Sequence, residues 1–192
     1  MMYQIFKRIF DLLASLIVVA LMFPLVVASA LAIKLTSSGP VFFLQERVGL
    51  HGRRFSIYKL RTMTVGNNSR DRQIRPGDVD VTRVGGILRR LKIDELPQVL
   101  NVLVGDMSLV GPRPCLVRTY ESMPDWAKTR FDVRPGMTGL AQINGNTAIS
   151  WEHRWKYDVE YAAKASMPLD CLIILKTIAV VLIGEERFGV AE

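Results

Sequence analysis

The sequence predicts an α+β protein that is mostly helical, with a small β-hairpin or sheet, an N-terminal membrane helix and amphipathic helices at the membrane interface. Three observations indicate this fold class. An uncharged apolar run from Leu12 to Ile33 is long enough to cross a bilayer as a helix. Aromatic and β-branched residues flank a glycine-containing turn between residues 41 and 63, which is typical of a hairpin. Apolar residues recur at helical spacing in the remainder of the 192-residue chain,.

The composition combines an apolar character with a positive charge. Hydrophobic residues make up 49% of the chain, and 25 basic residues against 18 acidic ones give a net charge of +7. This combination favours a membrane surface or anionic ligands as partners. The two cysteines, Cys115 and Cys171, have no metal-like spacing. They do not form a disulfide framework, which indicates a reducing compartment.

The N-terminal apolar run contains a proline, Pro24. A proline inside a helix removes one hydrogen bond and kinks the helix. Lys7 and Arg8 precede the run and Lys34 follows it, so the positive-inside tendency would keep both ends in the cytoplasm. A re-entrant helix broken at Pro24 satisfies this condition, whereas a single span with a tolerated proline does not; both topologies stay open. We assign residues 1–36 to this helix and residues 37–192 to a cytoplasmic domain lying on the membrane surface.

A basic stretch begins within the predicted hairpin, whose turn runs from Gly49 to Gly52. Lys59 and Arg61 stand in register at the end of its second strand. They either clamp a phosphate group or are solvated charges that protect a sheet edge. Between Glu46 and Lys92 there are twelve basic and four acidic residues, a local charge of +8. Residues 67–80 are polar and read as an exposed loop.

Two adjacent carboxylates, Asp94 and Glu95, lie in the sequence LKIDELPQ, after the basic residue Arg89. Pro97 suits the first turn of a helix, so the acids are predicted at or just before a helix N-terminus. The backbone N–H groups and the helix dipole favour anions such as phosphate there. The pair either takes part in phosphate chemistry or simply caps the helix.

Proline and glycine shape the two motifs that follow. Gly111-Pro112-Arg113-Pro114 predicts a rigid turn that holds its arginine at low entropic cost, unless that arginine is merely solvated. The stretch from Arg134 to Asn146 is rich in glycine, which allows the backbone to approach a ligand closely. Neither motif has the spacing of a dinucleotide-binding loop or a P-loop.

The C-terminal third predicts two helices at the membrane. Ser150 is a plausible N-cap, and an apolar stripe of Trp151, Trp155, Val159 and Ala162 follows. This stripe faces either the lipid headgroups or the protein core, with Asp158 on its flank as a further candidate for the active site. Residues 169–183 are nearly all apolar but too short and interrupted for a confident span.

The chain as a whole resembles the bacterial sugar transferase family, the small monotopic phosphoglycosyl transferases. The resemblance rests on six motifs in order: QERVG, YKLRTM, IDELPQ, GDMSLVGPRP, RPGMTGLAQING and ISWE. It runs from the membrane helix to about Leu182. It implies transfer of a sugar-1-phosphate from a UDP-sugar to polyprenyl (undecaprenyl) phosphate, with release of UMP. This would be the first membrane step of glycan assembly, at the cytoplasmic face of the bacterial inner membrane.

The resemblance also implies roles for single residues. Asp94 matches the nucleophile that forms a covalent phosphosugar-aspartyl intermediate in a ping-pong reaction, and Glu95 matches the residue that helps hold Mg²⁺. Lys59, Arg89 and Arg113 match basic residues lining the site. Phosphoryl attack by a carboxylate depends more on positioning and charge neutralisation than on basicity, which suits this set.

Two positions depart from the family pattern. Phe23 precedes Pro24, where the family usually has a serine. Asn146 stands where close relatives have an arginine; either Arg134 substitutes for it in binding phosphate or the sugar preference differs. The remaining expected partner is membrane phospholipid, and a homo-oligomer is left open.

The sequence also suggests two alternative functions. A non-enzymatic, membrane-anchored module could use the basic stretch to bind anionic lipid or nucleic acid. Nucleic-acid binding would call for a known motif or stacking aromatics, which are scarce between residues 46 and 92, so no nucleic-acid partner is expected. A glycosidase needs two carboxylates about 5 Å or more apart across a sugar, which adjacent side chains rarely provide.

Overall fold

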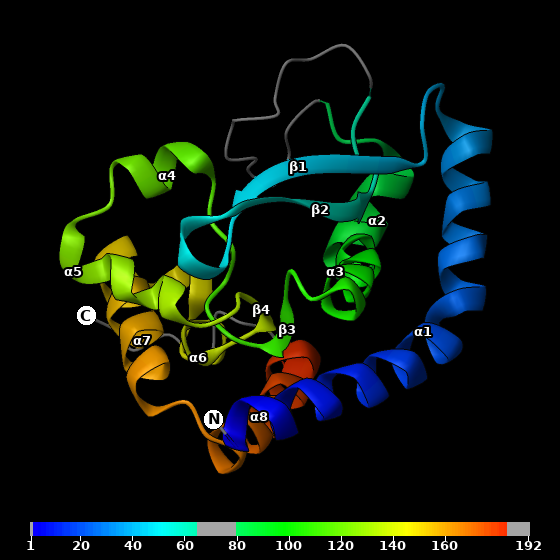
Figure 1. Ribbon diagram of the computed structural model, residues 1–192. Helices are drawn as coiled ribbons and strands as arrows, with labels where there is room; N and C mark the ends of the chain where they lie inside the picture. Colours follow the sequence, from blue (N-terminus) through cyan, green and yellow to red (C-terminus); the bar gives the residue numbers. More distant parts are fainter. Residues whose placement is uncertain (1, 65–79, 184–192) are drawn as a thin grey trace.

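The computed structural model describes residues 2–64 and 80–183, and it has the predicted α+β character (Figure 1). The expected loop at residues 67–80 lies outside the described residues except for Asp80. In chain order, the elements are α1 (Met2–Thr36), β1 (Phe42–Val48), η1 (Leu50–Gly52), β2 (Arg54–Leu60), α2 (Arg83–Arg90), η3 (Ile93–Gln98), α3 (Val99–Val104), β3 (Ser108–Val110), α4 (Val117–Glu121), α5 (Asp125–Lys128), η4 (Thr129–Asp132), β4 (Gly136–Thr138), α6 (Leu140–Ile143), η5 (Asn146–Ala148), α7 (Trp151–Lys164) and α8 (Met167–Ile183).

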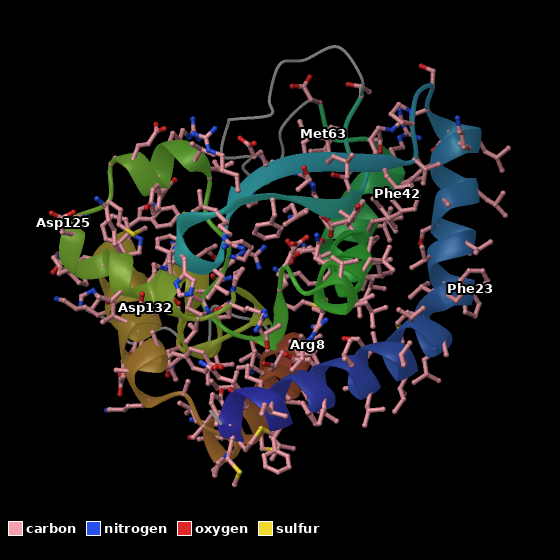
Figure 2. The ribbon with its side chains drawn as sticks, in the orientation of Figure 1. Arg8, Phe23, Phe42, Met63, Asp125 and Asp132 are labelled. Carbon is pink, nitrogen blue, oxygen red and sulfur yellow. The ribbon has the colours of Figure 1, made fainter. Side chains whose placement is uncertain are left out.

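Helix α1 is long, apolar and bent. It contains Pro24, and the ribbon changes direction at the level of Phe23 (Figures 1 and 2), as expected where a proline interrupts the helical hydrogen bonds. Among the described residues, α1 is the one helix long and apolar enough to cross a membrane, and only 11% of its apolar window is buried. The bend divides α1 into an N-terminal half and a C-terminal half.

The N-terminal half of α1 is fixed to the rest of the protein by charged side chains. Arg8 donates from Nη1 to the carbonyl of Val102 at 2.6 Å and from Nη2 to that of Leu103 at 2.8 Å. These carbonyls belong to the last turn of α3, where helical partners are missing. Lys7 forms an ion pair with Asp170 of α8 at 2.7 Å. This half therefore lies against α3 and α8 (Figure 1).

The C-terminal half of α1 is fixed by apolar packing. Ile33 is buried in a cluster with Leu60 from the end of β2 and Leu88 from α2. Ile87, which the sequence places in the same apolar stripe as Leu88, is instead 52% exposed. Both halves of α1 thus contact one body, formed by the segments that follow it.

The predicted hairpin is confirmed as a pair of antiparallel strands. β1 and β2 pair from Phe42 opposite Leu60 to Val48 opposite Arg54. Gly52 in the connecting turn has φ +75°, a conformation that glycine adopts without steric cost.

A second, parallel pair, β3 and β4, was not expected. It joins Ser108 to Gly136 and Val110 to Thr138. Each strand has three residues, too few for an alternating pattern to be visible in the sequence.

Two glycines in and after β4 have a role in backbone packing. A Cβ on Gly136 would lie 2.0 Å from the backbone nitrogen of Gly111, and one on Gly139 would lie 2.1 Å from the carbonyl oxygen of Gly111. Such distances exclude any side chain. The glycines are therefore required because two segments of backbone approach one another, and this contact fixes the start of the Gly111–Pro114 turn.

In helix α7 the most buried residues lie beside the apolar stripe, whose orientation toward lipid or core the sequence left open. Ser150 caps it as expected, accepting from the backbone N–H of His153 at 3.3 Å. Trp151 is 47% exposed, whereas Asp158 and Tyr161 are almost fully buried. Asp158 is buried because it has an internal partner, described below, and its polarity concealed this from the apolar pattern.

Helix α8 begins at Met167 and has Pro168 in its first turn, where a proline is tolerated. Leu172, Leu175, Ile178 and Val181 are exposed along it. This apolar surface lies on the helix that contacts the N-terminal half of α1 (Figure 1).

Candidate active site

The carboxylate pair lies in a 3₁₀-helix between α2 and α3. α2 ends at Arg90, and the chain reverses at Lys92, which has φ 57°. Asp94 and Glu95 occupy the first turn of η3, and Pro97 lies inside it. The acids therefore lie at a helix N-terminus, as predicted, although the helix begins at Ile93, four residues before Pro97. A short 3₁₀ segment loses only one hydrogen bond to an internal proline.

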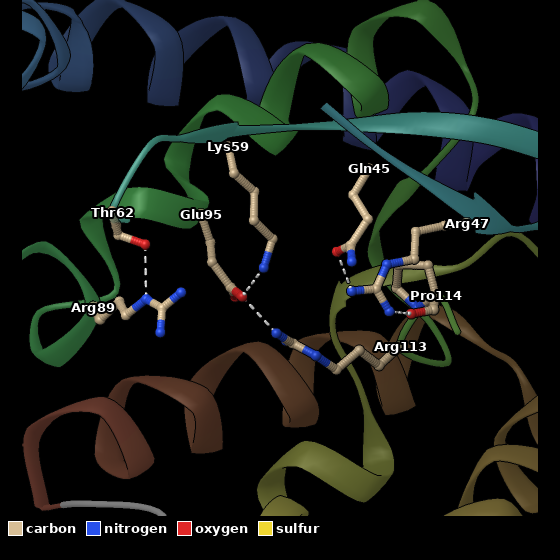
Figure 3. A network of polar contacts seen from close by, with 8 residues as sticks. All are labelled: Gln45, Arg47, Lys59, Thr62, Arg89, Glu95, Arg113 and Pro114. Atoms are coloured by element: carbon tan, nitrogen blue, oxygen red, sulfur yellow. Dashed lines mark hydrogen bonds and ion pairs between the residues drawn. The ribbon is translucent and has the colours of Figure 1, made fainter. Parts of the chain in front are cut away.

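Glu95 is held by two cations from separate elements. Its Oε1 accepts from Lys59 Nζ of β2 at 2.7 Å and from Arg113 Nη2 of the Gly111–Pro114 turn at 2.5 Å (Figure 3). Burial opposes ionisation of Glu95, but Arg113 and Lys59 outweigh it and hold the pKa of Glu95 well below its usual range,. Glu95 is therefore a fixed negative charge.

Asp94 has a different environment, although it is the next residue. It is 8% exposed, and its burial, together with the charge of Glu95, raises the pKa of Asp94 above its usual value. Lys59 and Arg89 act in the opposite direction. Two neighbouring carboxylates with separated pKa values are suited to separate roles.

Arg89 in α2 and Lys59 in β2 both act on the carboxylates. The family resemblance implies that these two basic residues line the site. Arg89 Nε donates to Thr62 Oγ1 at 2.8 Å (Figure 3), which fixes the guanidinium beside Asp94. Burial lowers the pKa of Lys59, although Glu95 partly restores it. The structure thus brings together five of the predicted site residues: Lys59, Arg89, Asp94, Glu95 and Arg113.

Arg47 is a neighbour of this cluster that the residue-level predictions missed. It donates to Gln45 Oε1 at 2.5 Å and to the carbonyl of Pro114 at 3.4 Å (Figure 3). Burial, and then the charge of Arg113, lower the pKa of Arg47 to about 10, so it is still a cation at neutral pH. Strand alternation places Arg47 on the half-buried face of β1 with Gln45,. This alternation could have predicted Arg47 as a neighbour of the site once the pairing of β1 with β2 was known.

Arg61 and Arg134, which were also predicted to bind phosphate, lie apart from this cluster. The Arg61 guanidinium is buried and donates to the carbonyls of Ser37, at 2.9 Å, and Ser38, just after α1. Arg134 Nε donates to the carbonyl of Gly105, just after α3, at 2.9 Å. Both side chains satisfy carbonyl groups at helix C-termini, where cations are favoured, and the structure does not bring them to Glu95.

The carboxylates of Asp94 and Glu95 are the candidate ligands for Mg²⁺ at this site. Among the described residues, no group of three or more His, Cys, Asp or Glu side chains could hold a metal ion. The two adjacent carboxylates alone would leave most of its coordination positions open. This fits Mg²⁺ that takes its other ligands from phosphate oxygens and water, as is usual for this ion.

The cluster as a whole is suited to an anionic, phosphorylated ligand. Three cations act on the two carboxylates at the join between the hairpin and η3: Lys59 and Arg113 on Glu95, and Lys59 and Arg89 on Asp94. Figure 3 shows these cations together with Glu95. Fixed cations of this kind stabilise the charge that develops on a transferred phosphoryl group. Among the residues that the structure describes, Glu95 is neutralised by direct ion pairs with Lys59 and Arg113, whereas the ion pairs found there do not include Asp94.

Comparison with known proteins agrees with this chemistry. Residues 2–184 match the family model of the bacterial sugar transferases. A sugar transferase of Bacillus subtilis (strain 168) is 44% identical over 182 residues, which cover 95% of this chain and 90% of the relative.

Two further relatives carry more specific names. The UDP-glucose:undecaprenyl-phosphate glucose-1-phosphate transferase of Caulobacter vibrioides is 45% identical, over 95% of this chain and 72% of the relative. The UDP-N-acetylgalactosamine-undecaprenyl-phosphate N-acetylgalactosaminephosphotransferase of Aeromonas hydrophila is also 45% identical, but the chain spans only 45% of its length. On the match to nearly its whole length, the chain belongs to the bacterial sugar transferase family.

Proposed function

We propose that this protein transfers a sugar-1-phosphate from a UDP-sugar to undecaprenyl phosphate and releases UMP. The names of the relatives from Caulobacter and Aeromonas support the class of donor and acceptor. The observation that carries the proposal is the Asp94–Glu95 pair inside its cationic cluster, in a protein with a long exposed apolar helix. A lipid-linked acceptor requires such a membrane-bound site.

The reaction proceeds in two displacements through Asp94. A carboxylate oxygen of Asp94 attacks the β-phosphorus of the UDP-sugar, the bond from that phosphorus to the bridging oxygen breaks, and UMP leaves. The sugar phosphate remains on Asp94. A phosphate oxygen of undecaprenyl phosphate then attacks the same phosphorus, and the Asp94 carboxylate is released. The raised pKa of Asp94 makes it a stronger nucleophile than an exposed aspartate.

The neighbouring residues hold and neutralise the diphosphate. Arg113 and Lys59 fix Glu95 as an anion, and Glu95 would hold Mg²⁺ together with the substrate phosphates. When bound, Mg²⁺ supplies the positive charge that lowers the repulsion between a carboxylate and a diphosphate. Arg89, fixed by Thr62, is placed beside Asp94 to neutralise the transferred group.

We further propose that α1 is a re-entrant helix and that the catalytic domain lies at the cytoplasmic face of the inner membrane. The anchoring of both halves of α1 to one domain supports this topology. A helix that spans the bilayer would have to carry one of these halves away from its partners.

A UMP-release assay with a panel of UDP-sugars, undecaprenyl phosphate and Mg²⁺ tests the function. The Asp94→Asn variant should lose at least about a thousandfold in rate, because an amide cannot take the place of the attacking carboxylate. It should still be recovered in the membrane fraction. The same substitution at Asp125, which is 97% exposed, is the matched control and should leave the rate unchanged. UMP release by Asp94→Asn at the unmodified rate would exclude Asp94 as the nucleophile.

A further inference from the structure

The turn that presents Arg113 to Glu95 is held on several sides. The backbone nitrogen of Gly111 donates to the carbonyl of Thr138 at 2.8 Å, and the carbonyl of Pro112 accepts from Gly136 at 2.9 Å. These bonds fix the part of the turn before Arg113. Beyond Arg113, Arg47 donates to the carbonyl of Pro114 and Val48 donates to that of Cys115. The carbonyl of Arg113 itself is reached neither by these bonds nor by the β3–β4 sheet, so it needs a further support.

That support is a buried arginine from η4. Arg130 Nη2 donates to the carbonyl oxygen of Arg113 at 2.7 Å. The same Nη2 lies 2.7 Å from Asp158 Oδ2 of α7, and the side chains of Arg130 and Asp158 are both only 4% exposed. A continuous chain of contacts therefore leads from Asp158 through Arg130 to the backbone of Arg113, whose side chain holds Glu95.

The Arg130–Asp158 ion pair is not expected to contribute much to the stability of the fold. Burial raises the pKa of Asp158 to about 6, although Arg130 opposes the change, so the carboxylate is held in unfavourable surroundings. Its second oxygen, Oδ1, finds no hydrogen-bond partner among the residues that the structure describes. Buried ion pairs can often be replaced by apolar residues without loss of stability. This pair therefore calls for a role beyond stability.

We infer that Arg130 and Asp158 are positioning residues, which hold the backbone of Arg113 so that its guanidinium meets Glu95 and the substrate phosphates. Asp158 orients the Arg130 guanidinium, and Arg130 fixes the Arg113 carbonyl. The inference rests on the proposed transferase function. A displacement of about 1 Å at a catalytic centre can cost roughly a hundredfold in rate, so loss of this support should lower activity while the fold persists.

The decisive variant is the double substitution Arg130→Met with Asp158→Leu. It removes both charges and the bond to Arg113, and replaces them with apolar groups of similar size, which preserves stability. The expected result is a melting temperature close to that of the unmodified protein, with kcat/KM for the UDP-sugar lowered roughly tenfold to a hundredfold. A double variant with unmodified stability and unmodified kcat/KM would overturn the inference.

A second variant covers the case in which the double variant fails to fold. Arg130→Lys keeps the charge, but a flexible ammonium group is not held in the rigid plane that places Nη2 between the carbonyl of Arg113 and Asp158,. Activity should again fall with little change in melting temperature. Full activity of Arg130→Lys would contradict the inference.

A readout independent of catalysis separates this inference from the proposed function. Amide hydrogen exchange at Arg113 and Cys115 should be faster in Arg130→Lys than in the unmodified protein, because the turn has lost its support. The exposed control Asp125→Asn should leave exchange there unchanged. If the unmodified protein released UMP from no UDP-sugar, the proposed function would be wrong. If amide hydrogen exchange at Arg113 and Cys115 were unchanged in Arg130→Lys, the positioning role would be wrong.

Discussion

Asp94 and Glu95 are neighbours in the chain, yet the fold holds their charges in opposite ways. Glu95 shares one oxygen with Lys59 and Arg113, and its pKa is depressed. Asp94 is buried with partial compensation from Lys59 and Arg89, and its pKa is raised. Lys59 therefore acts on both carboxylates, as an ion-pair partner for one and as a nearby cation for the other. This double role makes it the most informative residue for a test by pH.

Replacement of Lys59 by methionine should shift the acid limb of the pH–rate profile to higher pH. Lys59 lowers the pKa of Asp94, so its removal raises that pKa further. Asp94 must be ionised to attack, so activity is lost at a higher pH as the solution is acidified. The plateau of kcat/KM should also fall about a hundredfold, because a fixed cation is lost from the site.

This prediction is checked by the kcat/KM profile for the UDP-sugar between pH 4 and 9, with Lys128→Met as control. Lys128 pairs with Asp125 on the exposed side of α5, so its removal should leave the limb in place. An acid limb that stayed in place or moved to lower pH in Lys59→Met would show that Lys59 does not act on the ionisation of Asp94.

For single residues, the sequence predicted which residue types form the site better than it predicted which partner each side chain contacts. Lys59, Arg89 and Arg113 were expected beside the carboxylates, and they are found there. Arg61 and Arg134 instead satisfy the carbonyls that follow α1 and α3. A basic residue near a motif can form hydrogen bonds with any of several nearby carboxylates or backbone carbonyls. Which partner it reaches is decided by where helix ends lie in the fold, and this is not visible locally.

Among the elements, α2 has a placement that is sensitive to a single atom. It carries Arg89 to the site and lies against the segment that follows β2. A Cβ on Gly85 would lie 2.0 Å from the carbonyl oxygen of Thr62, whereas one on Gly86 would have nothing within 4 Å. Adjacent glycines in one helix therefore provide a matched pair of substitutions.

Gly85→Ala should destabilise the protein by about 1–3 kcal/mol or more, because α2 must move away from Thr62. Activity should fall as well, since Thr62 also fixes Arg89. Gly86→Ala should be neutral or stabilise by up to about 1 kcal/mol through its better helix propensity. Thermal unfolding of both variants in the same detergent checks the prediction, and equal losses of stability in the two would refute it.

Elements with a strong local pattern were predictable from the sequence, and those made by distant contacts were not. The β1–β2 hairpin has alternation and a glycine turn, and α7 begins after the predicted N-cap Ser150, so both agree with the structure. The β3–β4 pair depends on the close approach of Gly111 and Gly136, which no local pattern reports. The burial of Asp158 in α7 was not visible in the sequence for a similar reason, since its partner Arg130 comes from another element.

At the scale of the whole molecule, the bend in α1 decides how the protein meets the membrane. Arg8 and Lys7 fix the N-terminal half to α3 and α8, and Ile33 fixes the C-terminal half to the core. Phe23, at the bend, is 64% exposed and points away from the domain (Figure 2). The exposed apolar surface of α8 lies next to the N-terminal half of α1. Together these features support the proposed topology, in which the domain rests on one leaflet with the bend of α1 inserted into it.

Cysteine labelling should therefore place both ends of α1 on the same side of the membrane. Single cysteines at Met2 and Arg53, both exposed, would be introduced in a Cys171→Ser background, because Cys171 is exposed and Cys115 is buried. A membrane-impermeant maleimide should modify both in inside-out vesicles and neither in intact spheroplasts. A cysteine at Phe23 should resist the reagent in both preparations, since the re-entrant bend keeps it within the bilayer. Labelling of Met2→Cys in spheroplasts and of Arg53→Cys in inside-out vesicles would establish a true span, and the contacts of Lys7 and Arg8 with the domain could not then exist in the membrane.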